Sequence, residues 1–481
     1  MCGLQRVFHR ARVSLQRHPT DSTRALVPPQ RQGGEVLVKR PLWMGAVIGT
    51  ALTTGRAIAE ERFPPPEFET GYKIPALKYP LPKWVGMEYL DVALLLVALA
   101  VGTYLVYTKR SRRGLALLSI LSLFYFGFYR EGCVCAIGSI QNVALALGQT
   151  SYQIPLHVVG FFVLPLLFAL FFGRTFCAAV CPHGAIQELV VWRPVQVPRW
   201  LEHALGLLAY VYLGAAVLFA ATGTSFILCQ YDPFIAIFRL SGGFEMFLLG
   251  GCFLVIGLFV GRPYCRFLCP LGVLLGLFSH VSQKRVTIYP DHCVQCRLCE
   301  DSCPYNAIRE PTIDDSHCDN TTSRRRLLVY LALAPVLLLL FGFLGSQFGA
   351  PMARAHATVQ LQERLEQEDR GAVDGTTDAS TAFRDAGRSR KELAAATATI
   401  QRRFHIGGWL LGLWVGLVVA VKLIGLSVRR GRDEYEADRG ACVACGRCFP
   451  YCPADEDVRL QALASLEAES VEVRDETALL E

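Results

Sequence analysis

The sequence CVQCRLCEDSCP occupies residues 293–304, and CVACGRCFPYCP occupies residues 442–453. Both stretches follow the pattern C-x2-C-x2-C-x3-C-P, a ligand run whose cysteine thiolates bind 4Fe–4S clusters. In chains with two such runs, the fourth cysteine of one run binds the cluster held by the other run. Neither run is complete alone, so the pattern predicts two clusters and requires the two runs to meet in space.

The crossed pattern gives each cluster four ligands. One cluster is expected to bind Cys293, Cys296, Cys299 and Cys452. The other is expected to bind Cys442, Cys445, Cys448 and Cys303. Two strongly apolar stretches lie between the runs, which indicates a ferredoxin-like α+β module split by a transmembrane hairpin. Because two spans separate the runs, both runs emerge on the same face of the membrane whichever way the chain is inserted.

The composition is typical of a polytopic membrane protein. Hydrophobic residues make up 52% of the chain, and the net charge is +7. The positive charge lies beside apolar segments, where it sets orientation, so we expect no binding to nucleic acid. Eighteen cysteines are too many for a reducing compartment unless most of them bind metal or take part in redox chemistry.

Apolar stretches predict a mainly α-helical bundle of seven or eight transmembrane spans. The seven clearer stretches are residues 89–108, 115–129, 154–172, 204–222, 246–260, 327–348 and 406–428. Basic clusters that begin at Lys109, Arg324 and Arg429 place those loops in the cytoplasm. We therefore expect a multi-pass protein of the bacterial inner membrane, with its ferredoxin-like module on the cytoplasmic side.

The remaining segments follow from composition and position. Residues 1–40 are basic and are expected to be disordered. Residues 41–59 are either a cleaved signal peptide or a retained anchor helix, because they end in Ala57-Ile58-Ala59, which is similar to a signal-peptidase site. The further expected divisions are a periplasmic segment (60–88), the membrane core (89–280), the first ferredoxin half (281–323), the hairpin (324–428) with a periplasmic insert (350–403), the second ferredoxin half (429–457) and a tail (458–481).

An internal repeat carries four more cysteines. GRTFCAAVCPHG at residues 173–184 recurs as GRPYCRFLCPLG at residues 261–272. Two spans separate the copies, so they share one orientation, as in a parallel repeat about an axis along the membrane normal. Such an axis can bring together Cys177, Cys181, Cys265 and Cys269. Four thiolates suit a third iron–sulfur cluster or zinc; the alternative is that these cysteines are small apolar residues packed at helix ends.

Three cysteines lie in two apolar loops on the outer side. Cys133 and Cys135 belong to GCVCAIG, and Cys229 belongs to LCQYDPF. Non-helical backbone at membrane depth must be covered by protein. These cysteines could form a redox or metal centre at the outer face; a disulfide or simple packing explains them equally well.

Taken together, the motifs resemble the membrane polyferredoxin family of NosR and NapH, which combines C-x3-C-P repeats between transmembrane helices with ferredoxin runs. The resemblance covers residues 115–453, and the loops around Cys133 and Cys229 are closer to the NosR branch. It implies electron delivery from a quinol pool, or from a cytoplasmic donor, to a periplasmic reductase such as the nitrous oxide reductase of denitrification.

The chain departs from the NosR pattern in one respect. NosR-type proteins usually carry FMN on a threonine in a periplasmic Ser-Gly-Ala-Thr-like motif, and this motif is absent here. We therefore expect no FMN in this chain, and a separate flavin subunit could replace it. The same motifs also fit an alternative function, a redox assembly or maturation factor for a periplasmic metalloenzyme.

Overall fold

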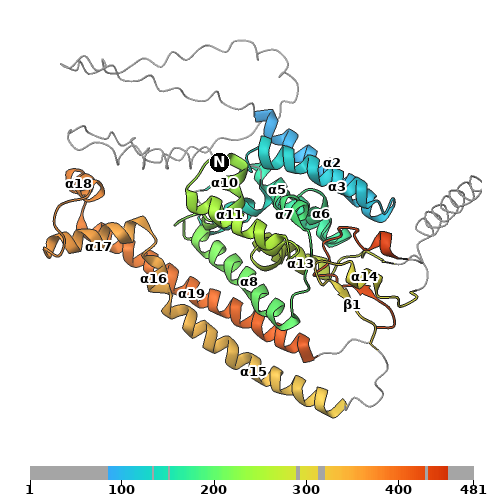
Figure 1. Ribbon diagram of the computed structural model, residues 1–481. Coiled ribbons are helices and arrows are strands. Elements are labelled where there is room, and N and C mark those ends of the chain that lie inside the picture. Colours follow the sequence, from blue (N-terminus) through green and yellow to red (C-terminus); the bar gives the residue numbers. More distant parts are fainter. Residues whose placement is uncertain are drawn as a thin grey trace, which may run out of the picture. The chain divides into compact units, whose positions relative to one another are not determined.

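The computed structural model describes residues 85–132, 135–149, 152–288, 293–312, 320–427 and 432–452. These residues all belong to one unit, residues 84–481, and they are mostly helical, which confirms the mainly α class (Figure 1). The predictions for the N-terminal segments before residue 85, for Cys133 and for the tail lie outside the described residues.

Helices of the membrane core make up the first part of the described chain. They are α2 (Val85–Tyr107), α3 (Arg112–Ser122), the π-helical η1 (Leu123–Tyr129), α4 (Ala136–Gly148), α5 (Leu156–Phe172), α6 (Thr175–Ala179), α7 (Pro182–Val190), α8 (Arg199–Ala221), α9 (Ile227–Gln230), α10 (Pro233–Arg239), α11 (Phe244–Gly257), α12 (Pro263–Phe267) and α13 (Pro270–His280). Proline occupies the first position of α7, α10, α12 and α13, where its fixed φ suits a helix start and its missing N–H is not needed.

The second part contains the two ferredoxin runs and the helices between them. Its elements are α14 (Leu298–Asp301), β1 (Ile308–Arg309), α15 (Asn320–Gln347), α16 (Gly349–Ala353), α17 (Ala357–Asp369), α18 (Asp378–Asp385), α19 (Arg390–Ser427), β2 (Glu436–Ala437) and the 3-10 helix η2 (Phe449–Tyr451). The insert 350–403 is thus largely helical, and α19 begins well before the apolar stretch at residue 406.

Four described helices, α2, α8, α15 and α19, are long and apolar enough to cross a membrane. Helices α10 and α11 are bent by 107° and would add a fifth span if they cross together. Helices α4, α5 and α13 are apolar but shorter. The described chain therefore has the character of a membrane protein, while the number of seven or eight spans stays a prediction.

Helices α15 and α19 form a close antiparallel hairpin (Figure 1). Glycines line their contact: a Cβ added at Gly412 would lie 2.0 Å from the Phe341 carbonyl oxygen, and one added at Gly345 would lie 2.2 Å from the Gly408 carbonyl oxygen. Small residues of this kind let membrane helices approach backbone to backbone.

The segments on either side of this hairpin come together. Strands β1 and β2 pair antiparallel, with Ile308 opposite Ala437 and Arg309 opposite Glu436. The pairing continues beyond the strands, because the Asp438 N–H donates to the Ala307 carbonyl at 2.7 Å. The chain before α15 and the chain after α19 therefore share one small sheet.

Candidate iron–sulfur centres

Three cysteines of the first run share a pocket with the fourth cysteine of the second run. Cys293, Cys296, Cys299 and Cys452 all line this pocket. Its other walls are mainly apolar or aromatic, from Ile288, Val294, Tyr435 and Tyr451. Four thiols around one apolar pocket are a donor set that fits a 4Fe–4S cluster. The grouping has the membership that the crossed pattern requires.

The complementary group also forms. The thiols of Cys442, Cys445 and Cys448 each interact electrostatically with Cys303. Burial raises the pKa of Cys442 to about 12 and that of Cys445 to about 11. Buried thiols resist ionisation unless a cation compensates the charge, so this donor set suits a metal-bearing cluster that deprotonates its ligands on binding.

Both runs use the same backbone conformation between their cysteines. Gln295 and Arg297 have positive φ angles of 54° and 67°, and Ala444 and Gly446 have 56° and 67°. These pairs stand at the same positions of C-x2-C-x2-C in the two runs. Positive φ is uncommon for residues other than glycine. Its recurrence shows that the two runs fold in the same local manner.

The four cysteines of the internal repeat are gathered at one place. The Cys181 thiol is buried and interacts with Cys265, Cys177 and Cys269. Burial raises the pKa of Cys181 and Cys269, and it raises that of Cys265 to about 11. Gln187 Nε2 donates to Cys265 Sγ at 3.1 Å, a contact of the kind that tunes sulfur ligands.

The arginine of each copy of the repeat lies against residues of the other copy. Arg262 of the second copy reaches the first, where its Nη1 donates to the Cys177 carbonyl at 2.6 Å. A Cβ added at Gly184 would lie 3.1 Å from Arg262 Nη1, and one added at Gly272 would lie 3.2 Å from Arg174 Nη2. The approach of an arginine to the glycine of the other copy is thus reciprocal, as a parallel repeat predicts, whereas Arg174 Nη1 donates to the Gly440 carbonyl.

The two outer loops also meet. Cys229 interacts with Cys135, and Gln141 Nε2 contacts Cys229 Sγ at 3.7 Å. Burial raises the pKa of Cys229 to about 12. Neither Cys135 nor Cys229 forms a disulfide in the described part of the chain.

A second apolar pocket lies between the loop that contains Cys135 and the first copy of the repeat. Cys135 of the outer loop and Cys181 of the repeat both line it, together with His183 and aromatic residues such as Phe126 and Phe161. His183 Nε2 lies 2.8 Å from Asp232 Oδ2, and both side chains are buried. This contact joins the repeat, which contains His183, to the loop that contains Cys229 and Asp232.

No three His, Cys, Asp or Glu side chains within the described ranges already stand at metal-ligand spacing. The first cysteine group shares one pocket, and the other groups are linked by electrostatic interactions between their thiols. Their roles as ligands stay predictions.

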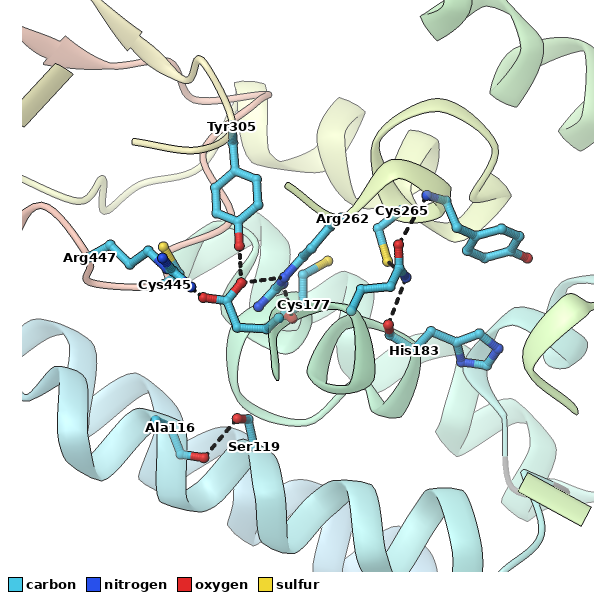
Figure 2. Close-up of polar contacts among 12 residues, drawn as sticks. Ala116, Ser119, Cys177, His183, Arg262, Cys265, Tyr305, Cys445 and Arg447 are labelled. Carbon is cyan, nitrogen blue, oxygen red and sulfur yellow. Dashed lines mark hydrogen bonds and ion pairs between the residues drawn. The ribbon is translucent and has the colours of Figure 1, made fainter. Parts of the chain in front are cut away.

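The most connected polar residue of the region is one that the sequence did not reveal. Glu188 of α7 is buried and pairs with Arg112, Arg262 and Arg447. Tyr305 also donates a hydrogen bond to it, and Figure 2 shows Arg262, Arg447 and Tyr305 around this carboxylate. Although burial opposes ionisation, the three arginines lower the pKa of Glu188 to about 2. Its partners lie far apart in the chain, so only the folded structure brings them together.

Two family models for 4Fe-4S binding domains match the chain. A 4Fe-4S binding domain model matches residues 154–207 and 243–288, the parts that hold the two copies of the repeat. A second 4Fe-4S binding domain model matches residues 286–309, which contain the first ferredoxin run. The chain therefore carries 4Fe–4S-binding domains.

Three curated relatives are similar to parts of the chain. NirI of Paracoccus denitrificans is 33% identical over 29% of this chain and 22% of NirI. The regulatory protein NosR of Stutzerimonas stutzeri is 25% identical over 47% of this chain and 35% of NosR. The ferredoxin-type protein NapH of Escherichia coli is 26% identical over 38% of this chain and 64% of NapH. The similar segments thus span less than two thirds of each relative. No solved structure matches the chain.

Proposed function

Because the chain belongs to the NosR/NapH-like family of 4Fe–4S membrane polyferredoxins, we propose that it moves electrons across the bacterial inner membrane. The donor would be a quinol pool or a cytoplasmic donor. The acceptor would be a periplasmic reductase of the nitrous oxide reductase type, a choice that rests on the similarity to NosR. A separate flavin subunit could accompany it.

Two clusters would be held in the crossed manner on the cytoplasmic side of a bundle of seven or eight spans. One would bind Cys293, Cys296, Cys299 and Cys452, and the other Cys442, Cys445, Cys448 and Cys303. The pairing of β1 with β2 supports this arrangement, since it closes the module across the α15–α19 hairpin. Bound clusters would supply one-electron transfer; the chain supplies thiols, apolar cover and hydrogen bonds to sulfur.

The observation that carries the proposal is that three groups of cysteines are connected in series: the second ferredoxin run, the internal repeat and the loops around Cys135 and Cys229. The second ferredoxin run is tied to the repeat cysteines through Arg112, Glu188 and Arg262. The repeat and the outer loops are joined in turn, because Cys181 and Cys135 line one pocket. We propose that the repeat cysteines would hold a third metal centre, and that a metal centre held by Cys133, Cys135 and Cys229 would receive the electron.

The first experiment counts iron and sulfide in the purified protein and records EPR spectra before and after reduction. Two clusters correspond to about eight irons per chain, and more iron would mean that the repeat cysteines also bind it. A protein purified under anoxic conditions without iron, sulfide or a reducible EPR signal would contradict the proposal.

The second experiment measures electron flow through proteoliposomes that enclose ferricyanide, with dithionite added outside. Wild-type protein should bleach ferricyanide much faster than empty vesicles do. The double variant Cys177→Ala/Cys265→Ala should stop this flow while both ferredoxin EPR signals persist. Wild-type flow and metal content in that variant would show that the repeat is packing. Transfer that stops after a single reduction per protein would favour the maturation-factor alternative.

A further inference from the structure

The Glu188 carboxylate uses both of its oxygens. Oε1 accepts hydrogen bonds from Arg112 Nη2 and Arg447 Nε, each at 2.7 Å. Oε2 accepts from Arg262 Nε at 3.1 Å and from the Tyr305 hydroxyl. Charge-assisted hydrogen bonds of this kind are stronger than neutral ones. One side chain thus holds four groups from four separate segments.

Two of these arginines continue to the backbone of cysteines in different groups. Arg262 Nη1 donates to the Cys177 carbonyl at 2.6 Å, in the internal repeat. Arg112 Nη1 donates to the Cys445 carbonyl at 2.9 Å, in the second ferredoxin run. The carboxylate therefore stands midway in a continuous chain of hydrogen bonds between Cys177 and Cys445.

The carboxylate at position 188 is not a shared feature of the two copies of the repeat. When the two copies are aligned on Cys181 and Cys269, the position of Glu188 corresponds to Gly276. A Cβ added at Gly276 would lie 3.4 Å from the Gly440 carbonyl oxygen. One copy thus meets the second ferredoxin half through a charged cluster, and the other copy meets it through close backbone packing.

We infer that Glu188 is a positioning residue for electron transfer: through Arg112 and Arg262 it fixes the cysteines of the second ferredoxin run relative to those of the repeat. This inference rests on the proposed function, since it concerns transfer between those two groups. Removing the carboxylate would leave three guanidinium groups clustered without their counterion, and the link between Cys177 and Cys445 would be broken.

The same site adds an electrostatic effect on the neighbouring cluster. Glu188 interacts with Cys445 across this site. Net charge and hydrogen bonding near a cluster set its reduction potential. Loss of a negative charge here favours the reduced, more negative cluster, so the midpoint potential should become more positive. A purely structural role would not move the potential in this direction while the iron stays bound.

The test compares the full-length wild-type protein with Glu188→Gln, which keeps the side-chain shape and removes the charge. Iron and sulfide content should equal wild type. The midpoint potential of the cluster assigned to Cys442, Cys445 and Cys448, followed by EPR during a redox titration, should rise. Bleaching of enclosed ferricyanide by external dithionite should slow about tenfold, the effect of a barrier raised by about 1.4 kcal/mol.

The matched control is Glu436→Gln. This carboxylate also pairs with an arginine, Arg285 at 3.3 Å, but the pair is exposed. The control should keep the wild-type potential and rate. A Glu188→Gln protein with wild-type potential and wild-type rate would overturn the inference.

If Glu188→Gln does not assemble, Arg112→Gln decides the question. This variant removes the link to the Cys445 carbonyl and leaves Arg262 and Arg447 on the carboxylate. Slower bleaching with wild-type iron content would support the inference, and a wild-type rate would overturn it. If the wild-type protein itself carries no electrons across vesicles, the proposed function fails, and the potential of Glu188→Gln still tests the role of the carboxylate.

Discussion

Cys452 shares its pocket with cysteines of the other ferredoxin run, and the thiols of its own run lie with Cys303. In a run of this spacing three cysteines bind one cluster, and the proline after the fourth favours extended backbone at that cysteine, as Cys452 adopts with φ −86° and ψ 110°. Because the fourth cysteine of each run lies with the other run, the two runs form one module. If the clusters bind as predicted, each depends on residues from both sides of the α15–α19 hairpin.

The crossed assignment predicts that Cys452→Ala damages the cluster of the first run. Its EPR spectrum should match that of Cys296→Ala, because both variants remove one ligand of the same cluster, and it should differ from that of Cys445→Ala. The control Cys252→Ala, an exposed cysteine of α11, should keep both signals. A Cys452→Ala spectrum that matches Cys445→Ala instead would refute the crossing.

Glu188 gives a second prediction at the scale of one residue. Its pKa of about 2 lies below the ordinary 4.5, so its stabilising effect is complete above pH 4.5 and is lost only as the pH falls toward 2. Glu188→Gln should therefore destabilise the protein by roughly 3 kcal/mol, and equally at pH 6 and pH 8. Thermal unfolding of both proteins in detergent measures this difference. A difference that shrinks between pH 6 and pH 8 would mean that another group provides the stabilisation.

Single residues also show what sequence can and cannot predict. The cysteine groups follow from spacing, because the C-x2-C and C-x3-C patterns place thiols locally and the runs require partners. Glu188 and Arg112 carry no such local pattern. A glutamate in a short helix has the same sequence signature whether it faces water or three arginines, and its partners come from segments whose proximity only the tertiary fold creates.

At the scale of elements, hydropathy predicts helices well and their breaks poorly. Helix α10 ends at Arg239 and is followed by Leu240, which has a left-handed φ of 47°; α11 begins at Phe244 after Gly242 and Gly243. The glycines allow the 107° bend between these helices. The apolar stretch 115–129 likewise does not reveal that α3 continues at Leu123 into the π-helical η1. A straight α-helix and a bent or π-helical segment have the same apolar composition, so hydropathy does not distinguish them.

The α15–α19 hairpin provides a prediction about packing. Gly412→Leu should lower the stability by roughly 3 kcal/mol or more, because its side chain would meet the Phe341 backbone of the facing helix. The matched control is Gly425→Leu in the same helix, where an added Cβ has nothing within 4 Å. Thermal unfolding in detergent should show a lower midpoint for Gly412→Leu alone. Equal midpoints for the two variants would mean that the helices do not pack through their glycines.

At the scale of the whole molecule, topology and chemistry constrain each other. The β1–β2 pair joins the chain on the two sides of the hairpin, which is feasible only if both sides lie on one face of the membrane. An even number of spans between the runs satisfies this condition, and α15 and α19 are two helices that are long and apolar enough. If both helices cross the membrane, the insert between them, which includes α17 and α18, lies on the opposite face.

This arrangement predicts the result of reporter fusions. Alkaline phosphatase, active only in the periplasm, should be active when fused after Gly375, between α17 and α18, and inactive when fused after Glu481. Green fluorescent protein, fluorescent in the cytoplasm, should give the reverse pattern. A fusion after Ser111, in the basic loop between α2 and α3, calibrates the cytoplasmic signal, because positive residues remain inside. Equal signals after Gly375 and Glu481 would refute the hairpin, and the two ferredoxin halves would then have to pair without a membrane crossing between them.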